Sequence, residues 1–355
     1  MSSTVLVTGA AGFIGSNLVR HLRRRWPDTP LISYDAVTYS GSEDNLASLA
    51  DDPLHAFVRG DILDREMLAR TLRDHAVTAI IHLAAESHVD RSILSPLEFV
   101  RTNVEGTVVL LQEAARAWRG TTGTRFHHVS TDEVFGTLGA TGRFSETSPY
   151  DPRSPYSASK AASDHFVRAW HETHGLPIVI TNCTNNYGPY QFPEKLIPVV
   201  ITRALAGLPV PVYGNGQNVR DWLFVDDHCE AIAQVFERGT SGETYCIGGE
   251  CEVANLDLVH RVLDELDRQC GNRPGTSRQL VQFVDDRPGH DFRYAMDTGR
   301  VRELGWRPRI PLEDGLRRTV EWYLANQIWL QRALSEAHRT FERAWYGARH
   351  HTAQG

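Results

Sequence analysis

The chain opens with a strand, a glycine-rich turn and a helix, and these three segments constrain its fold more than any other feature of the sequence. Residues 5–8 are an apolar run typical of a buried strand, and the helical pattern continues to about residue 25. Gly9, Gly12 and Gly15 lie between them. Glycine lets a backbone turn tightly, approach a phosphate and pack a helix on a strand. Because the first helical turn also presents free N–H groups, the segment predicts a pyrophosphate site for a dinucleotide.

The end of the second predicted strand indicates which dinucleotide is bound. This strand covers residues 31–35, and Asp35 stands 20 residues after Gly15. An acidic side chain at that position accepts a hydrogen bond from a ribose 2′-hydroxyl. Ala36 and Val37 follow it, and no arginine adjoins the carboxylate to hold a 2′-phosphate. We therefore predict NAD rather than NADP as the cofactor. The alternative for Asp35 is that it caps a loop.

Strands and helices alternate along the rest of the first half of the chain. The pattern predicts strands near 57–62, 79–85, 126–130 and 178–181, and helices near 64–74, 96–118 and 156–174. Such alternation predicts an α/β fold with a Rossmann-type, doubly wound parallel sheet. Ligands of these sheets lie beyond the carboxyl ends of the strands. We therefore expect Asp61 to contact an adenine, and the small residues Ala84 and Ala85 to let the cofactor lie close.

The stretch from Ser130 to Lys160 contains the residues that we predict to be catalytic. A polar strand end leads through a Pro- and Ser-rich loop to a helix that starts near Tyr156, with Ser154 and Pro155 as its cap and first turn. On that helix Tyr156 and Lys160 lie one turn apart on the same face. An ammonium beside a phenol favours the phenolate, so the pair predicts a tyrosine base. The alternative is a pair on the helix surface, which is common.

Lysine usage singles out the same residue. The chain contains 37 lysines and arginines, of which only Lys160 and Lys195 are lysines. A compact ammonium and a planar guanidinium are not interchangeable at a tight site. We therefore predict functional roles for both lysines, with survival by chance as the alternative.

After residue 188 the turns multiply and the predicted elements become short and mixed. We predict a dinucleotide-binding domain over 1–188, a smaller mixed α/β lobe over 189–337 and a polar tail over 338–355. The lobe is expected to contain strands near 210–213, 222–225, 244–247 and 280–284, and helices near 194–206, 227–238, 255–268 and 312–335. Polar residues near its loops predict a diphosphate clamp, although arginines near loops are most often solvated. They are Arg220, Asn255, Arg287, His290 and Arg293.

Composition excludes several classes of protein. The net charge of −7 argues against nucleic acid as a partner, although a local arginine cluster can still bind a small anion. Five cysteines form no Cys-x-x-Cys pair, which predicts reduced thiols and a cytoplasmic protein. We find no long apolar run and no signal-like N-terminus, so neither a membrane span nor secretion is expected. The 16 histidines show none of the usual metal-ligand spacings, so no metal is expected.

Eight motifs spread over nearly the whole chain resemble the extended short-chain dehydrogenase/reductase family, and in particular its members that dehydrate nucleotide sugars. The sequence aligns only loosely with them around Trp345 and Tyr346, where the family makes a substrate contact. The motifs cover residues 8–15, 83–90, 130–136, 156–160, 185–189, 194–198, 220–222 and 286–291.

The resemblance implies an activity and an assembly. The expected reaction converts dTDP-glucose to dTDP-4-keto-6-deoxyglucose, with a tightly bound NAD that is regenerated in each turnover. The family also pairs two long helices into a four-helix bundle, so the helices near 96–118 and 156–174 imply a homodimer.

The resemblance also implies roles for individual residues. Tyr156 would be the base and Lys160 its partner, Thr131 would contact the sugar, and Asp132 and Glu133 would be the acid and the base of an elimination. The implied NAD contacts are Gly9, Gly12, Phe13, Ile14, Gly15, Asp35, Asp61, Ile62, Leu83, Ala84, Ala85, Thr102, Tyr156, Lys160 and Asn186. The implied substrate contacts are Ser87, Thr131, Asn185, Lys195, Arg220, Asn255, Arg287 and His290.

The paired carboxylates Asp132 and Glu133 distinguish a dehydratase from the alternative functions. Elimination of water needs one carboxylate to take a proton and one carboxylic acid to give one, and mutual repulsion keeps one of two adjacent acids protonated. A nucleotide-sugar 4-epimerase shares the cofactor site and the Tyr/Lys pair but needs no acid pair. Other dehydratases acting on UDP-, GDP- or CDP-sugars stay open, because thymine rests on the resemblance alone. A non-catalytic NAD-binding protein should lack the intact set of reactive residues.

Overall fold

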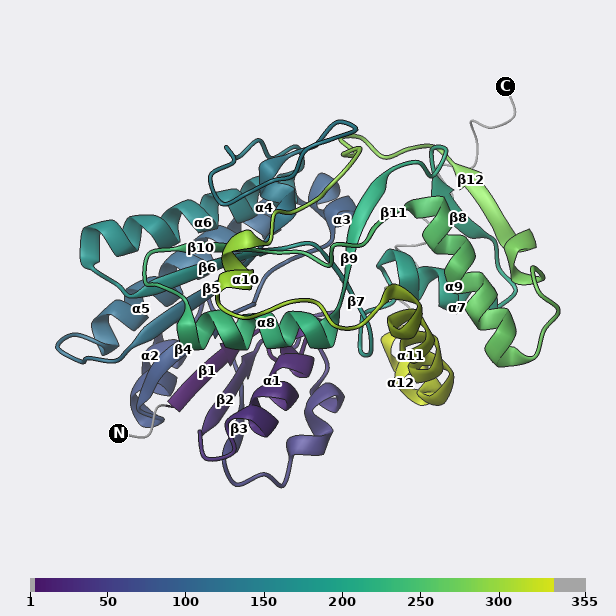
Figure 1. Ribbon diagram of the computed structural model, residues 1–355. Coiled ribbons are helices and arrows are strands. Elements are labelled where there is room, and N and C mark those ends of the chain that lie inside the picture. Colours follow the sequence, from purple (N-terminus) through teal and green to yellow (C-terminus); the bar gives the residue numbers. More distant parts are fainter. Residues whose placement is uncertain (1–3, 335–355) are drawn as a thin grey trace.

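A seven-stranded parallel sheet forms the larger part of the computed structural model, which describes residues 4–334 (Figure 1). The first strand lies inside the sheet, between the strands that follow it and those that come later in the chain. All neighbouring strands run parallel. Across the sheet the order is β10 (Thr244–Ile247), β6 (Ile178–Cys183), β5 (Arg125–Thr131), β4 (Val77–His82), β1 (Thr4–Thr8), β2 (Leu31–Asp35) and β3 (His55–Arg59).

Helices cover both faces of this sheet (Figure 1). Leu6, Ile80 and Phe126 point to one core, while Val5 and Ile81 point to the other. Strands buried on both faces appear in a sequence as continuous apolar runs, so the predicted doubly wound sheet is confirmed. The helices on one face are α2 (Arg65–Asp74), α5 (Thr107–Ala117) and α6 (Pro155–His174), and those on the other are α1 (Phe13–Arg25), α8 (Val225–Arg238) and α10 (Gly299–Glu303).

A smaller lobe lies beside the sheet, with a hydrophobic core of its own (Figure 1). Its strands form one sheet of three and one of two. They are β7 (Asn185–Tyr187), β9 (Val219–Phe224) and β11 (Glu252–Ala254), and β8 (Val210–Tyr213) and β12 (Val281–Val284). The helices of the lobe are α7 (Leu196–Leu205), α9 (Asn255–Cys270), η4 (Ser277–Leu280), α11 (Leu312–Ala325) and α12 (Gln327–Ala333).

Several connections between the strands of the large sheet contain short helices. The helix predicted near 96–118 is not continuous, since a turn of π-helix interrupts it. Its pieces are α4 (Pro96–Phe99), the π-helix η2 (Val100–Gly106) and α5, and α3 (Val89–Leu94) precedes them. The helix predicted near 312–335 is likewise two helices with a break at Asn326. Two further short helices are η1 (Glu43–Leu49) and η3 (Asp132–Phe135).

The chain crosses the predicted boundary at residue 188 more than once. β10, which we expected in the lobe, pairs with β6 and completes the large sheet. α8 packs against α1 on the same sheet, because its apolar face carries Val225, Ile232 and Ala233 into that core. The domain limits themselves stay a prediction.

No helix within residues 4–334 is long and apolar enough to cross a membrane. The predicted tail over 338–355 lies outside the described residues, as do Trp345 and Tyr346. The cytoplasmic location stays a prediction.

Candidate active site

A cavity of about 460 Å³ lies between the carboxyl ends of the sheet strands and the lobe. Every catalytic, cofactor and substrate residue that the resemblance implied lines this cavity. Arg293, which we also expected near the ligand, does not line it. Its guanidinium instead pairs with Glu252 at 2.6 Å and holds backbone carbonyls of the 139–142 loop. Residues predicted from separate stretches of the sequence therefore line one continuous cavity, and their roles stay a prediction.

The glycine turn fits a pyrophosphate. Gly9 has a φ of 69°, in the left-handed region that favours glycine. A Cβ on Gly15 would lie 2.0 Å from the Gly9 carbonyl oxygen, so helix α1 passes too close to the turn for any side chain. No side chain caps α1 at Gly12, which leaves the first N–H groups of the helix free to bind an anion.

Asp35 links the glycine turn to the end of β2. One carboxylate oxygen accepts a hydrogen bond from the Ala11 N–H at 2.8 Å, and the other accepts one from the Val37 N–H at 2.7 Å. Burial raises the pKa of this carboxyl, and the two hydrogen bonds oppose the shift. Asp35 therefore orders two loops, which is the role that the sequence offered as an alternative, while it also lines the cavity where a ribose would lie.

The π-helix places Thr102 on the cavity and is held by the next residue. The Asn103 amide accepts a hydrogen bond from the Glu86 N–H at 2.8 Å and donates one to the Glu86 carbonyl at 3.0 Å. It also donates to Ser159 on α6 at 2.8 Å. Asn103 thus fixes the loop after β4, the π-helix and α6 to one another around the cofactor region.

Helix α6 presents Tyr156 and Lys160 to the same cavity. A capping box between Ser154 and Ser157 fixes where the helix begins. The buried Lys160 ammonium donates to the Val129 carbonyl at the end of β5, at 2.9 Å. Burial raises the pKa of Tyr156 well above its ordinary value, as does the nearby Glu133 carboxylate. In this structure burial therefore outweighs any help that the ammonium gives to ionisation of the phenol.

Asp132 and Glu133 follow β5 directly and differ in their surroundings. Thr131 caps the short helix η3, and its hydroxyl lies 3.3 Å from the nearer Asp132 oxygen, while the other Asp132 oxygen is buried without a partner. Burial and the neighbouring Glu133 raise the pKa of Asp132 well above its ordinary value. Burial also raises the pKa of Glu133, but the cations of Arg287, Lys195 and Arg220 oppose it. The site therefore favours a protonated Asp132 beside a more readily ionised Glu133.

Cationic groups of the lobe face the two carboxyl groups across the cavity. Arg220 is held by the carbonyls of Val219 and Asp291 at 2.8 and 2.9 Å, and its guanidinium lies 4.3 Å from the centre of the Tyr294 ring. Lys195, immediately before α7, donates to the Ser87 carbonyl at 2.5 Å. These contacts position two cations at fixed points, as recognition of a diphosphate requires.

Three amide side chains among the predicted ligand contacts carry acceptor oxygens without a partner. The side-chain oxygens of Asn185 and Asn186 are buried without a hydrogen-bond partner, and so is that of Asn255 in the lobe. Buried polar atoms are nearly always paired. Their position along the cavity wall is consistent with the predicted contacts to cofactor and substrate.

The sequence prediction missed a cluster around Glu194. Its carboxylate accepts a hydrogen bond from the Tyr39 hydroxyl at 3.2 Å and lies 3.5 Å from the Arg91 guanidinium, and burial raises its pKa to about 7. Arg91 also stacks on Tyr39, 4.1 Å from the ring centre. Glu194 stands beside Lys195 in one of the motifs and could have been found from it. Tyr39 gave no signal, because it lies in an irregular loop 155 residues away in the chain.

In the part of the chain that the structure describes, no group of three or more His, Cys, Asp or Glu side chains is arranged to hold a metal ion.

Comparison with known proteins places these features in a family. A family profile described as GDP-mannose 4,6 dehydratase matches residues 6–319. A dTDP-glucose 4,6-dehydratase from Xanthomonas campestris is 52% identical over 344 residues, which is 95% of this chain and 97% of the relative.

Solved structures agree with the sequence relatives. A dTDP-glucose 4,6-dehydratase from Streptomyces venezuelae, crystallised with NAD bound, matches with a TM-score of 0.86 and 50% identity over 93% of this chain and 99% of that one. A UDP-glucose 4-epimerase from Thermotoga maritima matches with a TM-score of 0.80 and 29% identity, over 91% of this chain and 99% of the other. The fold is thus common to dehydratases and epimerases, whereas sequence identity is higher to the dehydratase.

Proposed function

The chain belongs to the family described as GDP-mannose 4,6 dehydratase, and we infer that it dehydrates dTDP-glucose to dTDP-4-keto-6-deoxyglucose with NAD as its cofactor. One observation carries this conclusion beyond the family level. A carboxyl pair, the buried Asp132 and the partly buried Glu133, lines the same cavity as Tyr156, Lys160 and the glycine turn. An elimination needs that pair, whereas an epimerisation does not.

The reaction requires an oxidation before it can eliminate water. The hydrogen on C5 of glucose is not acidic until C4 becomes a ketone. NAD, when bound, supplies this chemistry by taking a hydride from C4 and returning it to C6. The chain would hold this cofactor through the glycine turn, Asp35 and Lys160, with Thr102 and Asn186 along the cavity wall.

Three side chains of the site would carry out the proton transfers. Tyr156 takes the proton of the C4 hydroxyl, and the Lys160 ammonium stabilises the phenolate that this requires. Glu133 takes the proton from C5, because it is the more readily ionised carboxyl of the pair, and gives a proton back to C5 when the hydride reaches C6. Asp132, whose pKa is held well above its ordinary value by burial, protonates the departing C6 hydroxyl.

The lobe would hold the nucleotide diphosphate. Arg220, Arg287 and Lys195 supply cations along the cavity, and Asn255 supplies an amide. Burial and the neighbouring arginines lower the pKa of His290 to about 4, so its ring is neutral at pH 7. His290 would therefore contribute a neutral hydrogen bond to a phosphate rather than a charge, while Ser87, Thr131 and Asn185 face the sugar.

The rival activity is 4-epimerisation, whose enzymes share the fold. The direct test is incubation of the purified protein with dTDP-, UDP-, GDP- and CDP-glucose, followed by measurement of the alkaline absorbance of a 4-keto-6-deoxy sugar. Rapid product formation from the dTDP-sugar alone is the expected result. Inversion at C4 without a keto product, or absence of any turnover, would contradict the proposal.

We also propose that two copies associate through the face built by α3, α4, η2 and α6. Those elements pack against one another beside the sheet (Figure 1). Large apolar side chains stand exposed on them: Leu97 is 69% exposed, Leu94 61%, Val100 48% and Phe166 39%. An apolar patch of this kind favours burial against a partner, and a second copy of the chain meets this need in a symmetric dimer.

A further inference from the structure

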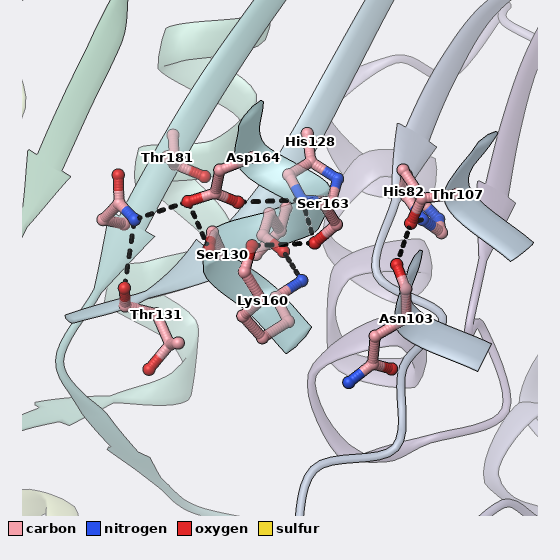
Figure 2. A network of polar contacts seen from close by, with 12 residues as sticks. His82, Asn103, Thr107, His128, Ser130, Thr131, Lys160, Ser163, Asp164 and Thr181 are labelled. Atoms are coloured by element: carbon pink, nitrogen blue, oxygen red, sulfur yellow. Dashed lines mark hydrogen bonds and ion pairs between the residues drawn. The ribbon is translucent and has the colours of Figure 1, made fainter. Parts of the chain in front are cut away.

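Asp164 is a fully buried carboxylate that no step of the proposed reaction uses. It lies on α6 one turn after Lys160 and does not line the cavity. Figure 2 shows it in a network of polar contacts with His128 and Ser130. Its polar neighbours come from β5, β6 and the loop before α6. They are Tyr150 at 2.8 Å, Ser130 at 2.9 Å, His128 at 3.1 Å and Asn182 at 3.3 Å.

The charge of this carboxylate differs from that of the catalytic pair. Burial raises the pKa of Asp164, but the His128 ring, the Lys160 ammonium and the Ser130 hydroxyl outweigh it and hold the pKa below its ordinary value. The pKa values of Asp132 and Glu133 are both raised. Asp164 is therefore the carboxyl group that stays ionised beside Lys160 while the other two accept protons more readily.

Lys160 needs a counter-charge because it is itself buried. Burial lowers its pKa, and Asp164 is the strongest opposing influence. Its ammonium contacts the Val129 carbonyl, which is neutral. An isolated buried cation is costly, and proteins either pair it or discharge it. The i,i+4 spacing on α6 brings the two groups to the same helix face.

The same carboxylate also ties the helix to the strand that carries the catalytic acids. It accepts from the Ser130 hydroxyl on β5. The Asn182 amide on β6 donates both to Asp164 and, at 3.0 Å, to the Thr131 carbonyl. Thr131 directly precedes Asp132. The position of Tyr156 and Lys160 relative to the acid pair therefore depends on contacts that converge on one carboxylate.

We propose that Asp164 is a positioning residue that supplies the buried counter-charge of Lys160 and holds the end of β5 in register with α6. It acts through Lys160 and touches neither substrate nor cofactor. This inference rests on the proposed function, because it assumes that a charged Lys160 is needed for oxidation at C4.

The titratable groups around the pair do not replace this charge. Burial lowers the pKa of His128 on β5 to about 4, and that of His82 on β4 well below its ordinary value, so both rings are neutral at pH 7. Burial raises the pKa of the Cys183 thiol on β6 to about 12. Arg168 lies further along α6 and donates to the Tyr150 hydroxyl at 2.9 Å.

The direction of the expected effect follows from these charges. An asparagine at position 164 would keep the shape and an acceptor oxygen but remove the negative charge. Without it the Lys160 ammonium loses its proton at lower pH. Since the charged lysine is the active form, the alkaline limb of the pH–rate profile should move to lower pH.

The first test compares Asp164→Asn with Tyr150→Phe, which removes one hydrogen bond to the carboxylate but leaves its charge. In Asp164→Asn the alkaline limb of kcat for dTDP-glucose should move down by at least one pH unit, with KM within about threefold of wild type at pH 6.5. In Tyr150→Phe the limb should stay in place. A folded Asp164→Asn variant with the wild-type limb would overturn the proposal, as would an equal movement in Tyr150→Phe.

The second test observes the lysine directly and does not depend on turnover. Protein labelled with ¹³C at lysine Cε gives two lysine signals, from Lys160 and Lys195, and the Lys195→Arg variant assigns them. In the wild type, Lys160 should remain charged at pH 8, and this part of the test holds even if Asp164→Asn fails to fold. In Asp164→Asn the Lys160 signal alone should titrate at lower pH. A neutral Lys160 at pH 8 in the wild type would overturn the proposal. Wild-type turnover, measured separately, reports on the function itself.

Discussion

Asp132 and Glu133 are neighbours in the chain, but the fold gives them different surroundings. Asp132 is buried and Glu133 partly so, and desolvation raises the pKa of each. The difference lies in the cations around them: Arg287 and Lys195 of the lobe oppose the rise in the pKa of Glu133, whereas Arg220 opposes it for both carboxyl groups. In the proposed mechanism a single dipeptide would therefore provide both the acid and the base of the elimination.

The sequence indicated individual residues where the residue type or its spacing was unusual. Lys160 was indicated by the scarcity of lysine and by its spacing from Tyr156. Asp164 gave no comparable signal, since an aspartate in a helix is ordinary and its contacts to β5 and β6 cannot be read from spacing. Tyr39 and Glu194 were missed for the same reason, because their contact joins loops distant in the chain.

His228 should make the protein less stable in acid. Both its ring nitrogens are buried without a partner, and burial alone lowers its pKa to about 3. Below the unfolded value of about 6.5 the unfolded chain takes up a proton that the folded protein resists. The free energy of unfolding should therefore fall as pH drops from about 6.5 towards 3, at about 1.4 kcal/mol per pH unit for this group.

Thermal unfolding of His228→Leu should show a shallower decline in stability with falling pH. The exposed His174→Leu variant should keep the wild-type slope, and an unchanged slope in His228→Leu would contradict this prediction.

At the level of elements, periodicity predicted the helices and strands but not their interruptions. The apolar pattern from 96 to 118 predicted one helix, whereas the structure contains a π-helical turn at Val100–Gly106. That turn is held by Asn103, which bonds to a loop 17 residues earlier in the chain. The extra turn lies where Thr102 lines the cavity, and π-helical turns occur often at functional sites. A tertiary contact of this kind leaves no trace in a periodic pattern.

The glycine turn yields a test of the cofactor site. Gly15→Ala places a Cβ 2.0 Å from the Gly9 carbonyl oxygen and 2.8 Å from the Ala10 Cα, so the turn must shift. The variant should be purified with less than a tenth of the NAD found per chain in the wild type, as measured after denaturation. Gly139→Ala is the control, because a Cβ there meets nothing within 4 Å. Full NAD content in folded Gly15→Ala would show that the turn does not bind the pyrophosphate.

At the scale of the whole molecule, the site lies between the large sheet and the smaller lobe, and the chain passes between them several times. The lobe supplies the cations, and the sheet supplies the carboxyl groups and the Tyr/Lys pair. The alternation of elements was enough to predict the parallel sheet. It did not predict that β10 would complete this sheet, because a strand late in the chain shows no sequence sign of the neighbour it pairs with.

The proposed dimer can be tested by disrupting its apolar face. Leu97→Glu combined with Val100→Glu places two charges where a second copy should pack, which is costly for a buried interface. Light scattering at micromolar concentration should give twice the chain's mass for the wild type and the single mass for the variant. Leu208→Glu, at an exposed leucine after α7, should remain a dimer. A monomeric wild type would refute the assembly.

We propose that Asp132 and Glu133 carry out the elimination, while Tyr156 and Lys160 carry out the oxidation. A single-turnover reaction followed at the NADH absorbance separates the two steps. Glu133→Gln keeps the volume of the side chain but removes the base, so oxidation at C4 should proceed and the reaction should stop there. Tyr156→Phe should block the first step and serves as the matched comparison.

Glu133→Gln should accumulate reduced cofactor in the first turnover and lose roughly 100-fold or more in steady-state rate. Tyr156→Phe should leave the cofactor oxidised. No NADH signal in Glu133→Gln with intact affinity for dTDP-glucose, or turnover near the wild-type rate, would contradict the assignment of Glu133 as the base.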